Sequence, residues 1–418
     1  MCRSTHRSQD AAMKPAVRVG ATGFGLIAVC YGFARFAFGL FLPQIREDLA
    51  LSPTLAGVIS GGAFFAYCVA IVVSARMSER VGARAVAVAA ALVAGLGMLG
   101  IAASPSPMCL AVFVVMAGAS TGLASPPMAD AVAHAVAKAR RNATNTVINA
   151  GTSAGVALSG PVALVMGHEW RTVFLFFAGA AFALAVMALV WLPSGTGQER
   201  PDNRRGRRPT LDANLIRLVG ASFFMGASST AIWSFGGEIT SMRLGWSTRD
   251  IGLLWIAIGA AGVFGAGAGW LVARFGLNAV HRLFLVVLAA SIAIVGLSFT
   301  SPALTLAGGA LFGAAYVMLT GVYLVWGTSA LPHRPATGLM VGFLTIAVGQ
   351  TAGASLFGFL LDRVSLEMTV LVFACLGLAA GFFWFESRSA GSSAADAGFG
   401  ATSLLEASRV ARTRADGA

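Results

Sequence analysis

Residues 20–42 read GATGFGLIAVCYGFARFAFGLFL, an apolar stretch that holds one charged side chain, Arg35. A transmembrane α-helix needs about 20 predominantly apolar residues to cross the hydrocarbon core of a bilayer. The stretch is long enough for this, and it exceeds the roughly 7 to 15 residues of the apolar part of a signal peptide. We interpret it as the first membrane-spanning helix.

The whole chain has a similar composition. Hydrophobic residues make up 57% of its 418 residues and charged residues 11%, and the mean hydropathy is +0.79. Soluble domains carry about 25% charged residues, so an ordinary soluble domain is excluded. The 51 glycines suit lipid, because small residues let helix backbones approach closely there. The composition predicts an all-α membrane protein surrounded by a lipid bilayer.

Twelve apolar segments follow one another along the chain. They are 20–42, 55–75, 85–103, 108–133, 143–166 and 172–192, then 214–237, 251–272, 281–299, 303–330, 338–361 and 367–385. The stretch 194–213 between the two sets is basic and rich in Gly and Pro, which indicates a linker. We predict an N-terminal segment at 1–19, a six-helix bundle at 20–193, a linker at 194–213, a second bundle at 214–386 and a tail at 387–418.

Basic residues between the segments gather in alternate loops. Only five of the 29 Lys and Arg residues lie in the other loops, namely Arg46, Arg171, Arg243, Arg249 and Arg363. Cytoplasmic loops carry the excess of Lys and Arg, so both termini, the linker and the tail are predicted in the cytoplasm. The net charge of +12 reports this orientation, since the basic residues form no stripe with interleaved aromatics for nucleic acid.

The two sets of segments also resemble each other at a nearly constant offset. The stretch 52–57 (SPTLAG) corresponds to 247–252 (STRDIG), and 80–82 (RVG) to 274–276 (RFG). Pro107 and Gly118 correspond in the same order to Pro302 and Gly313. A shared order and spacing of this kind indicates an internal duplication. We expect two pseudo-repeated six-helix bundles.

Residues 75–84 read ARMSERVGAR and resemble the cytoplasmic signature G-x-x-x-D-R-x-G-R-R of the major facilitator superfamily. The run 31–43, YGFARFAFGLFLP, resembles the first helix of a bacterial YbfB-like subgroup of that superfamily. The resemblance implies a monomeric secondary active transporter of the bacterial inner membrane that works by alternating access. It also implies a gating role for six residues, which are Glu79, Arg80, Gly82, Arg84, Arg274 and Gly276.

The fifth predicted span carries several glycines and a proline. These residues, Gly151, Gly155, Gly160 and Pro161, resemble the Gly-Pro signature of antiporter members of the superfamily. Glycines four residues apart form a smooth helix face, and proline removes a backbone donor, so this helix is expected to pack closely and to bend. The resemblance slightly favours efflux.

Arg35 is the only Lys or Arg deep inside a predicted span. Burying a guanidinium in hydrocarbon costs ~3 kcal/mol or more, so its partner is expected to be a water-filled cavity, a carboxylate or backbone carbonyls. Tyr31 lies one turn away, and Ala28, Gly32 and Gly39 are expected to share its face and to border a cavity. Two hypotheses stay open: Arg35 binds an anionic group of the substrate, or it joins two helices through carbonyls.

Polar and aromatic residues on other spans could complete a substrate site. The predicted set is Arg35, Tyr31, Asn149, Ser229, Trp233, Tyr316, Thr320, Tyr323 and Gln350. The seventh and tenth predicted spans contribute stripes at helical spacing, such as Tyr316, Thr320 and Tyr323 on the tenth. The alternative for each residue is a hydrogen bond or packing contact that joins helices in lipid.

Two acidic residues near the ends of spans are candidates for coupling to protons, which the resemblance allows as a driving ion. They are Asp130, with His134 one turn later, and Glu238. The alternative for Asp130 is an ion pair with Lys138 or Arg140 at the membrane surface.

The predicted function is transport of a small organic anion or an amphipathic aromatic compound. The alternatives are a transporter of a neutral sugar or drug, in which Arg35 is structural, and a membrane sensor that does not transport. No span gathers the acids, bases or nucleophiles of an enzyme, and the five cysteines lack metal-binding spacing. We therefore expect no catalytic residue, no metal, no cofactor and no nucleic-acid partner.

Overall fold

The computed structural model describes residues 2–167, 169–194 and 213–386, and every regular element within them is a helix. In the first half these are α1 (Cys2–Ile27), η1 (Ala28–Phe36), α2 (Ala37–Leu49), α3 (Pro53–Val81), α4 (Ala83–Ala103), α5 (Pro107–Ala135), η2 (Lys138–Arg140), α6 (Arg141–Met166) and α7 (Trp170–Trp191). The predicted tail and nearly all of the predicted linker lie outside the described residues.

The second half continues the helical pattern. Its elements are α8 (Ala213–Trp233), α9 (Gly236–Leu244), α10 (Thr248–Gly262), η3 (Val263–Gly267), α11 (Ala268–Phe275), α12 (Leu277–Gly296), α13 (Pro302–Ala330), α14 (Pro335–Leu361), α15 (Leu366–Ala379) and η4 (Ala380–Phe382). Within the described part of the chain, 11 helices are long and apolar enough to cross a membrane, and a shorter apolar helix, Leu366–Phe382, follows them. The predicted all-α membrane fold with twelve spans is confirmed.

Three predicted spans differ from the helices that form. The first runs over Pro15–Leu49 rather than 20–42, because the polar residues after Leu42 end the apolar run but not the helix. The helix ends where Ala50 adopts a left-handed backbone with φ 49°. The span predicted at 214–237 stops at Trp233, and a turn separates α8 from α9. In the eighth span, η3 interrupts the predicted helix 251–272.

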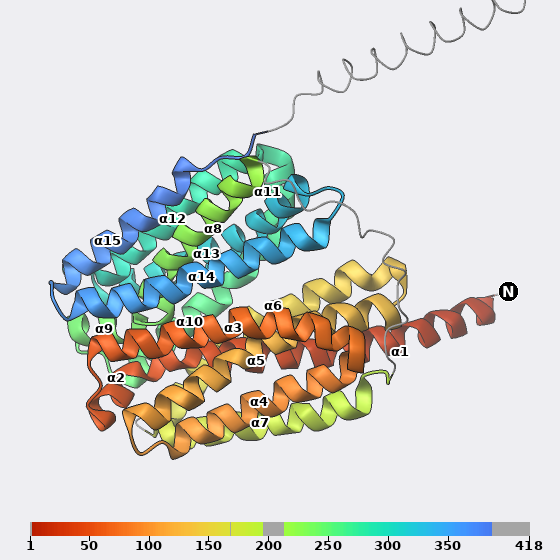
Figure 1. The fold of residues 1–418 in the computed structure, drawn as a ribbon, viewed down its shortest axis with the longest axis horizontal. Helices are drawn as coiled ribbons and strands as arrows, with labels where there is room; N and C mark the ends of the chain where they lie inside the picture. Colours follow the sequence, from red (N-terminus) through yellow and green to blue (C-terminus); the bar gives the residue numbers. More distant parts are fainter. Residues whose placement is uncertain (1, 168, 195–212, 387–418) are drawn as a thin grey trace, which may run out of the picture. The chain divides into compact units, whose positions relative to one another are not determined.

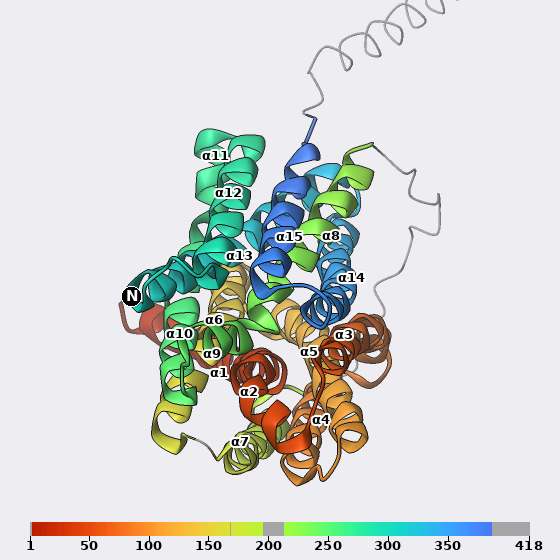
Figure 2. The ribbon, with the colours of Figure 1, turned by 90° about the vertical axis from the view of Figure 1, so that its left-hand side faces the viewer.

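The helices of the two halves form two groups (Figure 1). In the first half α5 packs between α3 and α4, α7 packs on α4, and α1 packs on α6. In the second half α13 packs on α10 and α12, while α8 packs on α14 and α15. The main contacts between the halves are α3 with α14 and α6 with α10, and α2 also lies against α9 (Figure 2). These crossings place the first span next to the second half.

Glycine makes the two crossings between the halves possible. A Cβ atom on Gly57 of α3 would clash with the carbonyl oxygen of Ala354 in α14. At the other crossing, a Cβ on Gly252 of α10 would lie 2.8 Å from the carbonyl oxygen of Gly160 in α6. Small residues allow such backbone contacts in lipid, where no hydrophobic effect drives helices together. Gly57 and Gly252 are equivalent in the predicted duplication.

The duplication is visible in the backbone. Gly82 (φ 86°, ψ 156°) and Gly276 (φ 83°, ψ 150°) adopt nearly the same conformation between equivalent helices. Both have a positive φ, which glycine tolerates better than any other residue. Four helices begin after a serine N-cap at equivalent places; these are Ser52, Ser106, Ser247 and Ser301. The two pseudo-repeated bundles are thus confirmed.

Candidate substrate site

The first span changes its helical type at the level of Arg35. Residues Ala28–Phe36 form the π-helical segment η1, and the N–H group of Ala37 donates to the carbonyl oxygen of Gly32, five residues earlier. Short π-helical segments inside α-helices are frequent at functional sites. Eight of the nine residues of η1 are buried, including Arg35. The widened turn therefore holds a cation inside the membrane part of the protein.

Four aromatic rings surround the guanidinium of Arg35. Its Cζ lies 4.6 Å from the ring centroid of Phe64, 4.7 Å from that of Tyr67, 5.1 Å from Phe36 and 5.7 Å from Tyr31. A cation within about 6 Å of a ring face is attracted by the negative charge of that face. The rings come from η1 and α3, so the first half alone builds this aromatic cage.

The second half supplies a neutral hydrogen-bond partner. Arg35 Nη2 donates to Oε1 of Gln350 on α14 at 2.6 Å, and Arg35 Nε has no hydrogen-bond partner. Among the described residues, no carboxylate pairs with Arg35. The side chain is 8% exposed. Arg35 is therefore a buried cation whose charge no acidic residue described here neutralises.

Gln350 connects Arg35 to two further helices. Its Nε2 donates to Oγ of Ser229 on α8 at 3.3 Å and to the hydroxyl of Tyr316 on α13 at 3.2 Å. Gln350 and Ser229 are both fully buried. The amide thus turns its oxygen to the first half and its nitrogen to the second, which fixes its orientation without any charge.

Trp233 extends the aromatic surface into the second half. Its ring stacks on Phe36 at 4.1 Å between centroids and meets Phe312 and Tyr316 edge-on at 5.3 and 5.2 Å. The indole Nε1 of Trp233 is buried and has no hydrogen-bond partner. A buried N–H group that lacks a partner costs about 1–3 kcal/mol. Trp233 and Arg35 therefore each hold an unused donor, and both side chains contact the ring of Phe36.

The arrangement combines an uncompensated cation, unused donors and flat aromatic walls at the junction of two halves. A cation of this kind attracts an anionic group, and a guanidinium can hold a carboxylate through two parallel hydrogen bonds. The rings favour a planar apolar body beside that group. The charge, the free donors and the rings are thus the chemical groups that recognise a small aromatic anion.

Six of the nine residues predicted for the site come together. They are Tyr31, Arg35, Ser229, Trp233, Tyr316 and Gln350. Three others lie elsewhere. Asn149 is exposed, Thr320 bonds back to the carbonyl oxygen of Tyr316, and the hydroxyl of Tyr323 donates to the carbonyl oxygen of Ala221 inside the second half.

The expected small-residue cavity face beside Arg35 is wrong. A Cβ atom on Gly32 would clash with the backbone of Gly155, and one on Gly39 would clash with the carbonyl oxygen of Trp233. Ala28 lies against the same helix, because its backbone limits the space at Gly155. These small residues press the first span against α6 and α8, since they leave room for backbone contact.

The aromatic cage contains residues that the sequence did not single out, namely Phe36, Phe64 and Tyr67. Phenylalanine gives no signal in an apolar chain with 28 of them. Tyrosine is rarer, with only four in the chain, and three of these, Tyr31, Tyr67 and Tyr316, lie at or next to the Arg35 cluster. The scarcity of tyrosine was the usable signal.

A protein-family model matches most of the chain. Residues 24–354 match the model of the Major Facilitator Superfamily. The chain belongs to this superfamily. The inward-open structure of the xylose transporter XylE from E. coli has the same fold, with a TM-score of 0.73 and 13% identity over 90% of this chain and 98% of that chain. The superfamily is a family of transporters, and the 11 long apolar helices among the described residues agree with a multi-pass membrane protein; the YbfB-like subgroup stays a prediction.

Curated superfamily members match shorter parts of the chain. The gentisate transporter of Corynebacterium glutamicum is 25% identical over 184 residues, 41% of each protein. The gallate transporter of Pseudomonas putida is 26% identical over 170 residues, 40% of this chain and 37% of that protein. An MFS-type efflux pump of Mycolicibacterium smegmatis is 32% identical over 251 residues, 55% of this chain and 56% of that protein. The chain thus matches about two fifths of the two aromatic-acid transporters.

The predicted gating residues lie at the superfamily signature between α3 and α4 and at its repeat. Glu79 and Arg80 are exposed, and neither side chain forms a hydrogen bond or ion pair with another described residue. Arg84 Nε donates to the carbonyl oxygen of Leu192, within the first half, at 2.8 Å. Arg274 is exposed and lies over the ring of Phe275. Their gating role stays a prediction.

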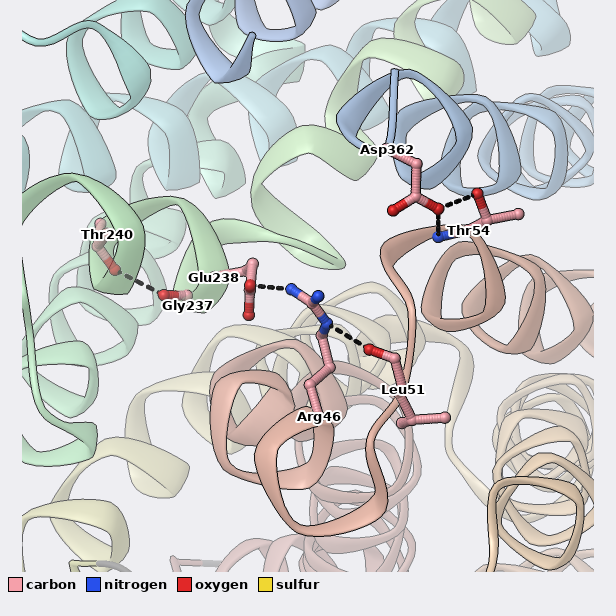
Figure 3. A network of polar contacts seen from close by, with 7 residues as sticks. All are labelled: Arg46, Leu51, Thr54, Gly237, Glu238, Thr240 and Asp362. Atoms are coloured by element: carbon pink, nitrogen blue, oxygen red, sulfur yellow. Dashed lines mark hydrogen bonds and ion pairs between the residues drawn. The ribbon is translucent and has the colours of Figure 1, made fainter. Parts of the chain in front are cut away.

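The two coupling candidates have different surroundings. Asp130 pairs with His134 at 3.1 Å, so the expected pair with Lys138 or Arg140 is wrong. Asp130 and His134 are one helical turn apart on α5, which brings their side chains together. Glu238 instead forms an ion pair with Arg46 of the first half (Figure 3). Only Glu238 thus connects the two halves.

Proposed function

We propose that this protein is a secondary active transporter that moves a small aromatic carboxylate across the membrane by alternating access. The carboxylate binds the guanidinium of Arg35. The observation that carries this proposal is the buried position of Arg35 without an acidic partner among the described residues.

The uncompensated charge of the site favours an anion. An arginine in the membrane interior costs ~3 kcal/mol or more, and cation–π contacts return about 0.5–2 kcal/mol each. Gln350 adds one hydrogen bond to a neutral oxygen. These contacts support the cation but leave its charge in place. An incoming carboxylate would neutralise this charge and use the free Nε of Arg35.

The walls of the site support an aromatic body for the substrate. Phe64, Tyr67 and Trp233 offer ring faces and edges beside Arg35. Aromatic pairs prefer offset or edge-on contacts, worth about 0.5–1.5 kcal/mol beyond the buried area. Gentisate and gallate are both hydroxylated benzoate ions, and transporters named for them match this chain. Their substrates agree with the chemistry of the site.

The position of the site suits alternating access. Arg35 belongs to the first half, and Gln350, Ser229 and Tyr316 belong to the second. A ligand held by both halves binds at the interface of the two repeats, as in superfamily folds that rock around a central site. The basic loops support a cytoplasmic position for both termini and for the linker 194–213. The membrane that the protein spans is then the inner membrane of a bacterium.

The test is counterflow of labelled aromatic acids into proteoliposomes. Vesicles preloaded with gentisate or gallate should accumulate the labelled acid, while hydroquinone, a neutral analogue without the carboxylate, should neither exchange nor compete. Arg35→Gln should abolish the exchange, while Arg363→Gln should keep it. Arg363 is the matched control because its guanidinium also lies over a ring, that of Phe359 at 3.8 Å, at an exposed position.

Two outcomes would reject the proposal. Equal exchange of the neutral analogue would assign Arg35 a structural role and favour the alternative, a transporter of a neutral sugar or drug. Unchanged exchange of gentisate in Arg35→Gln would remove the anion site. Folding of each variant is checked by its elution as a monodisperse protein in detergent.

A further inference from the structure

The end of the first span crosses to the second half a second time (Figure 3). Arg46 Nη1 on α2 forms an ion pair with Glu238 on α9, and Arg46 Nε donates to the carbonyl oxygen of Leu51 at 3.0 Å. The side chain of Glu238 is 9% exposed and that of Arg46 is 19% exposed. Arg46 and Glu238 thus hold the two halves together with opposite charges that are mostly out of water.

Arg46 is the charged group that faces Glu238. Arg243 on the same helix is directed to Thr300 and to the carbonyl oxygen of Leu297 instead. The charged groups of the other elements packed against α9 have other partners or lie elsewhere. On α10, Asp250 caps Ser247 and Arg249 approaches Gly167. On α2, Asp48 pairs with Arg171 and Glu47 is exposed. Arg217 of α8 and His281 and Arg282 of α12 lie near the opposite ends of their helices. The charge of Glu238 is therefore balanced mainly by Arg46.

The protonation of Glu238 is poised by opposing effects. Burial raises the pKa of the Glu238 carboxyl above its ordinary value, and the nearby charge of Arg46 lowers it. Glu238 also lies in the first turn of α9, where the helix dipole favours a negative charge. Burial is the larger effect, so Glu238 takes up a proton at a higher pH than an exposed glutamate does.

A second carboxylate crosses between the halves at the same end. Asp362, just after α14, accepts hydrogen bonds from the backbone N–H of Thr54, at 2.9 Å, and from its hydroxyl group. It thereby caps the start of α3, a helix of the other half. Ser60 and Ser234 add a neutral contact of 2.7 Å between the halves. Asp362 is exposed, so water screens it more than Glu238.

We propose that Glu238 and Arg46 form a proton-operated outer gate, in which protonation of Glu238 releases Arg46 and lets the halves separate at this end. The contact of Thr54 with Asp362 does not depend on the proton of Glu238, so it opposes opening to the same extent in both protonation states and breaks when the halves separate. The gate rests on the proposed transport function, since it controls access to the Arg35 site from this side. The only covalent bond that forms is that of the proton to the Glu238 carboxylate; the other changes are in noncovalent contacts.

The direction of the pH effect follows from the pair. Above the pKa of Glu238 its carboxylate is charged, the ion pair is intact and this end is closed. Below that pKa the neutral acid no longer attracts Arg46, and the closed state is held only by the remaining contacts at this end, such as that of Asp362 with Thr54. The open population should therefore rise as the pH falls.

The test measures the distance between the halves at this end in the full chain, in liposomes and without substrate. Spin labels are attached at Met108→Cys and Phe299→Cys, which are 75% and 78% exposed, after the native cysteines are replaced by serine. Acidification should increase the open population of the otherwise unchanged protein by about fivefold or more, the lower end of typical coupling between two states. Glu238→Gln should show the open population at every pH.

Control variants separate this gate from general loosening. Asp48→Asn breaks contacts at the same end to Trp170 and Arg171, which belong to the same half as Asp48, and should keep the closed state and its pH response. Asp362→Asn should raise the open population but keep the pH response. Arg46→Gln removes the other partner of the ion pair and should also raise the open population. One of the two variants is sufficient if the other fails to fold.

Two results would overturn the gate. One is a pH response that persists in Glu238→Gln, and the other is a distance in Glu238→Gln that equals that of the unsubstituted pair. Because no substrate is present, failure of the gate leaves the Arg35 site standing. A failure of aromatic-acid exchange would likewise leave the measured gate intact.

Discussion

Two arginines of the first span, Arg35 and Arg46, are eleven residues apart, and both reach across to the second half. Arg46 meets a carboxylate, while Arg35 meets the amide of Gln350. An ion pair neutralises itself, so it can close an empty protein. A cation that pairs only with an amide is neutralised when a ligand arrives. Within one span, the charge of the partner therefore distinguishes the two arginines: the one paired with a carboxylate can hold the halves closed, and the one paired with an amide can bind an anion.

The sharpest way to break this comparison is to remove the unpaired charge. Arg35→Gln should lower the affinity for an aromatic carboxylate by about 30-fold or more, because losing one partner of a buried charge pair costs about 2 kcal/mol or more. Arg35→Lys keeps the charge but loses the planar guanidinium, so its affinity should lie between those of the unsubstituted protein and Arg35→Gln. Calorimetric titration with gentisate measures both, and an unchanged affinity in Arg35→Gln would contradict the site.

The second test makes the site resemble the latch. Gln350→Glu places a carboxylate next to Arg35, so the anion must compete with it, and its affinity at neutral pH should fall by about tenfold or more for the loss of about 1.4 kcal/mol. Acidification that protonates the new carboxyl should restore binding. Gln350→Ala is the control, since it removes the hydrogen bond without adding a charge and should show no recovery in acid. Tight binding by Gln350→Glu at neutral pH would argue against an anionic ligand.

The third test removes the charge from the latch. Glu238→Gln should flatten the pH dependence of exchange, because it removes the titrating carboxyl of the gate while Arg35 and its partners keep their contacts. Burial raises the pKa of Glu238, so the unsubstituted protein should gain exchange rate as the outer pH falls. Counterflow measured over a pH series shows this, and a slope that survives in Glu238→Gln would separate the ion pair from transport.

The smallest effect is expected for an ion pair that does not cross between the halves. Asp48 and Arg171 are 46% and 41% exposed in their side chains, and exposed pairs contribute less than about 1 kcal/mol. Asp48→Asn should shift the thermal unfolding midpoint only slightly and leave exchange unchanged. A large loss of exchange would show that charge at this end matters regardless of which half carries it.

The sequence predicted the fold because its signals are one-dimensional. Apolar length, alternating basic loops and a constant offset between repeats need no knowledge of contacts. Helix ends were harder, as α2 shows, since its polar last turns left no hydropathy signal. Arg35 was found for the same reason, because a charge inside an apolar run is visible in the sequence alone.

The partners of the candidate residues could not be predicted in the same way. Arg46 and Glu238 are 192 residues apart in the chain, and nothing local connects them. The side chains of Tyr316, Thr320 and Tyr323 do not meet at one place, because seven residues advance about 10 Å along a helix. Tyr316 therefore reaches Gln350, whereas Tyr323 lies at another level and bonds to Ala221.

The π-helical segment Ala28–Phe36 has a consequence for comparing this chain with relatives. Each hydrogen bond that spans five residues instead of four fits an extra residue into a turn. A relative whose first helix is α-helical throughout has fewer residues over the same rise. An alignment without a gap in this segment would keep only one side of it in register, so either the residues before Ala28 or those after Phe36 would be paired with the wrong residues of that relative.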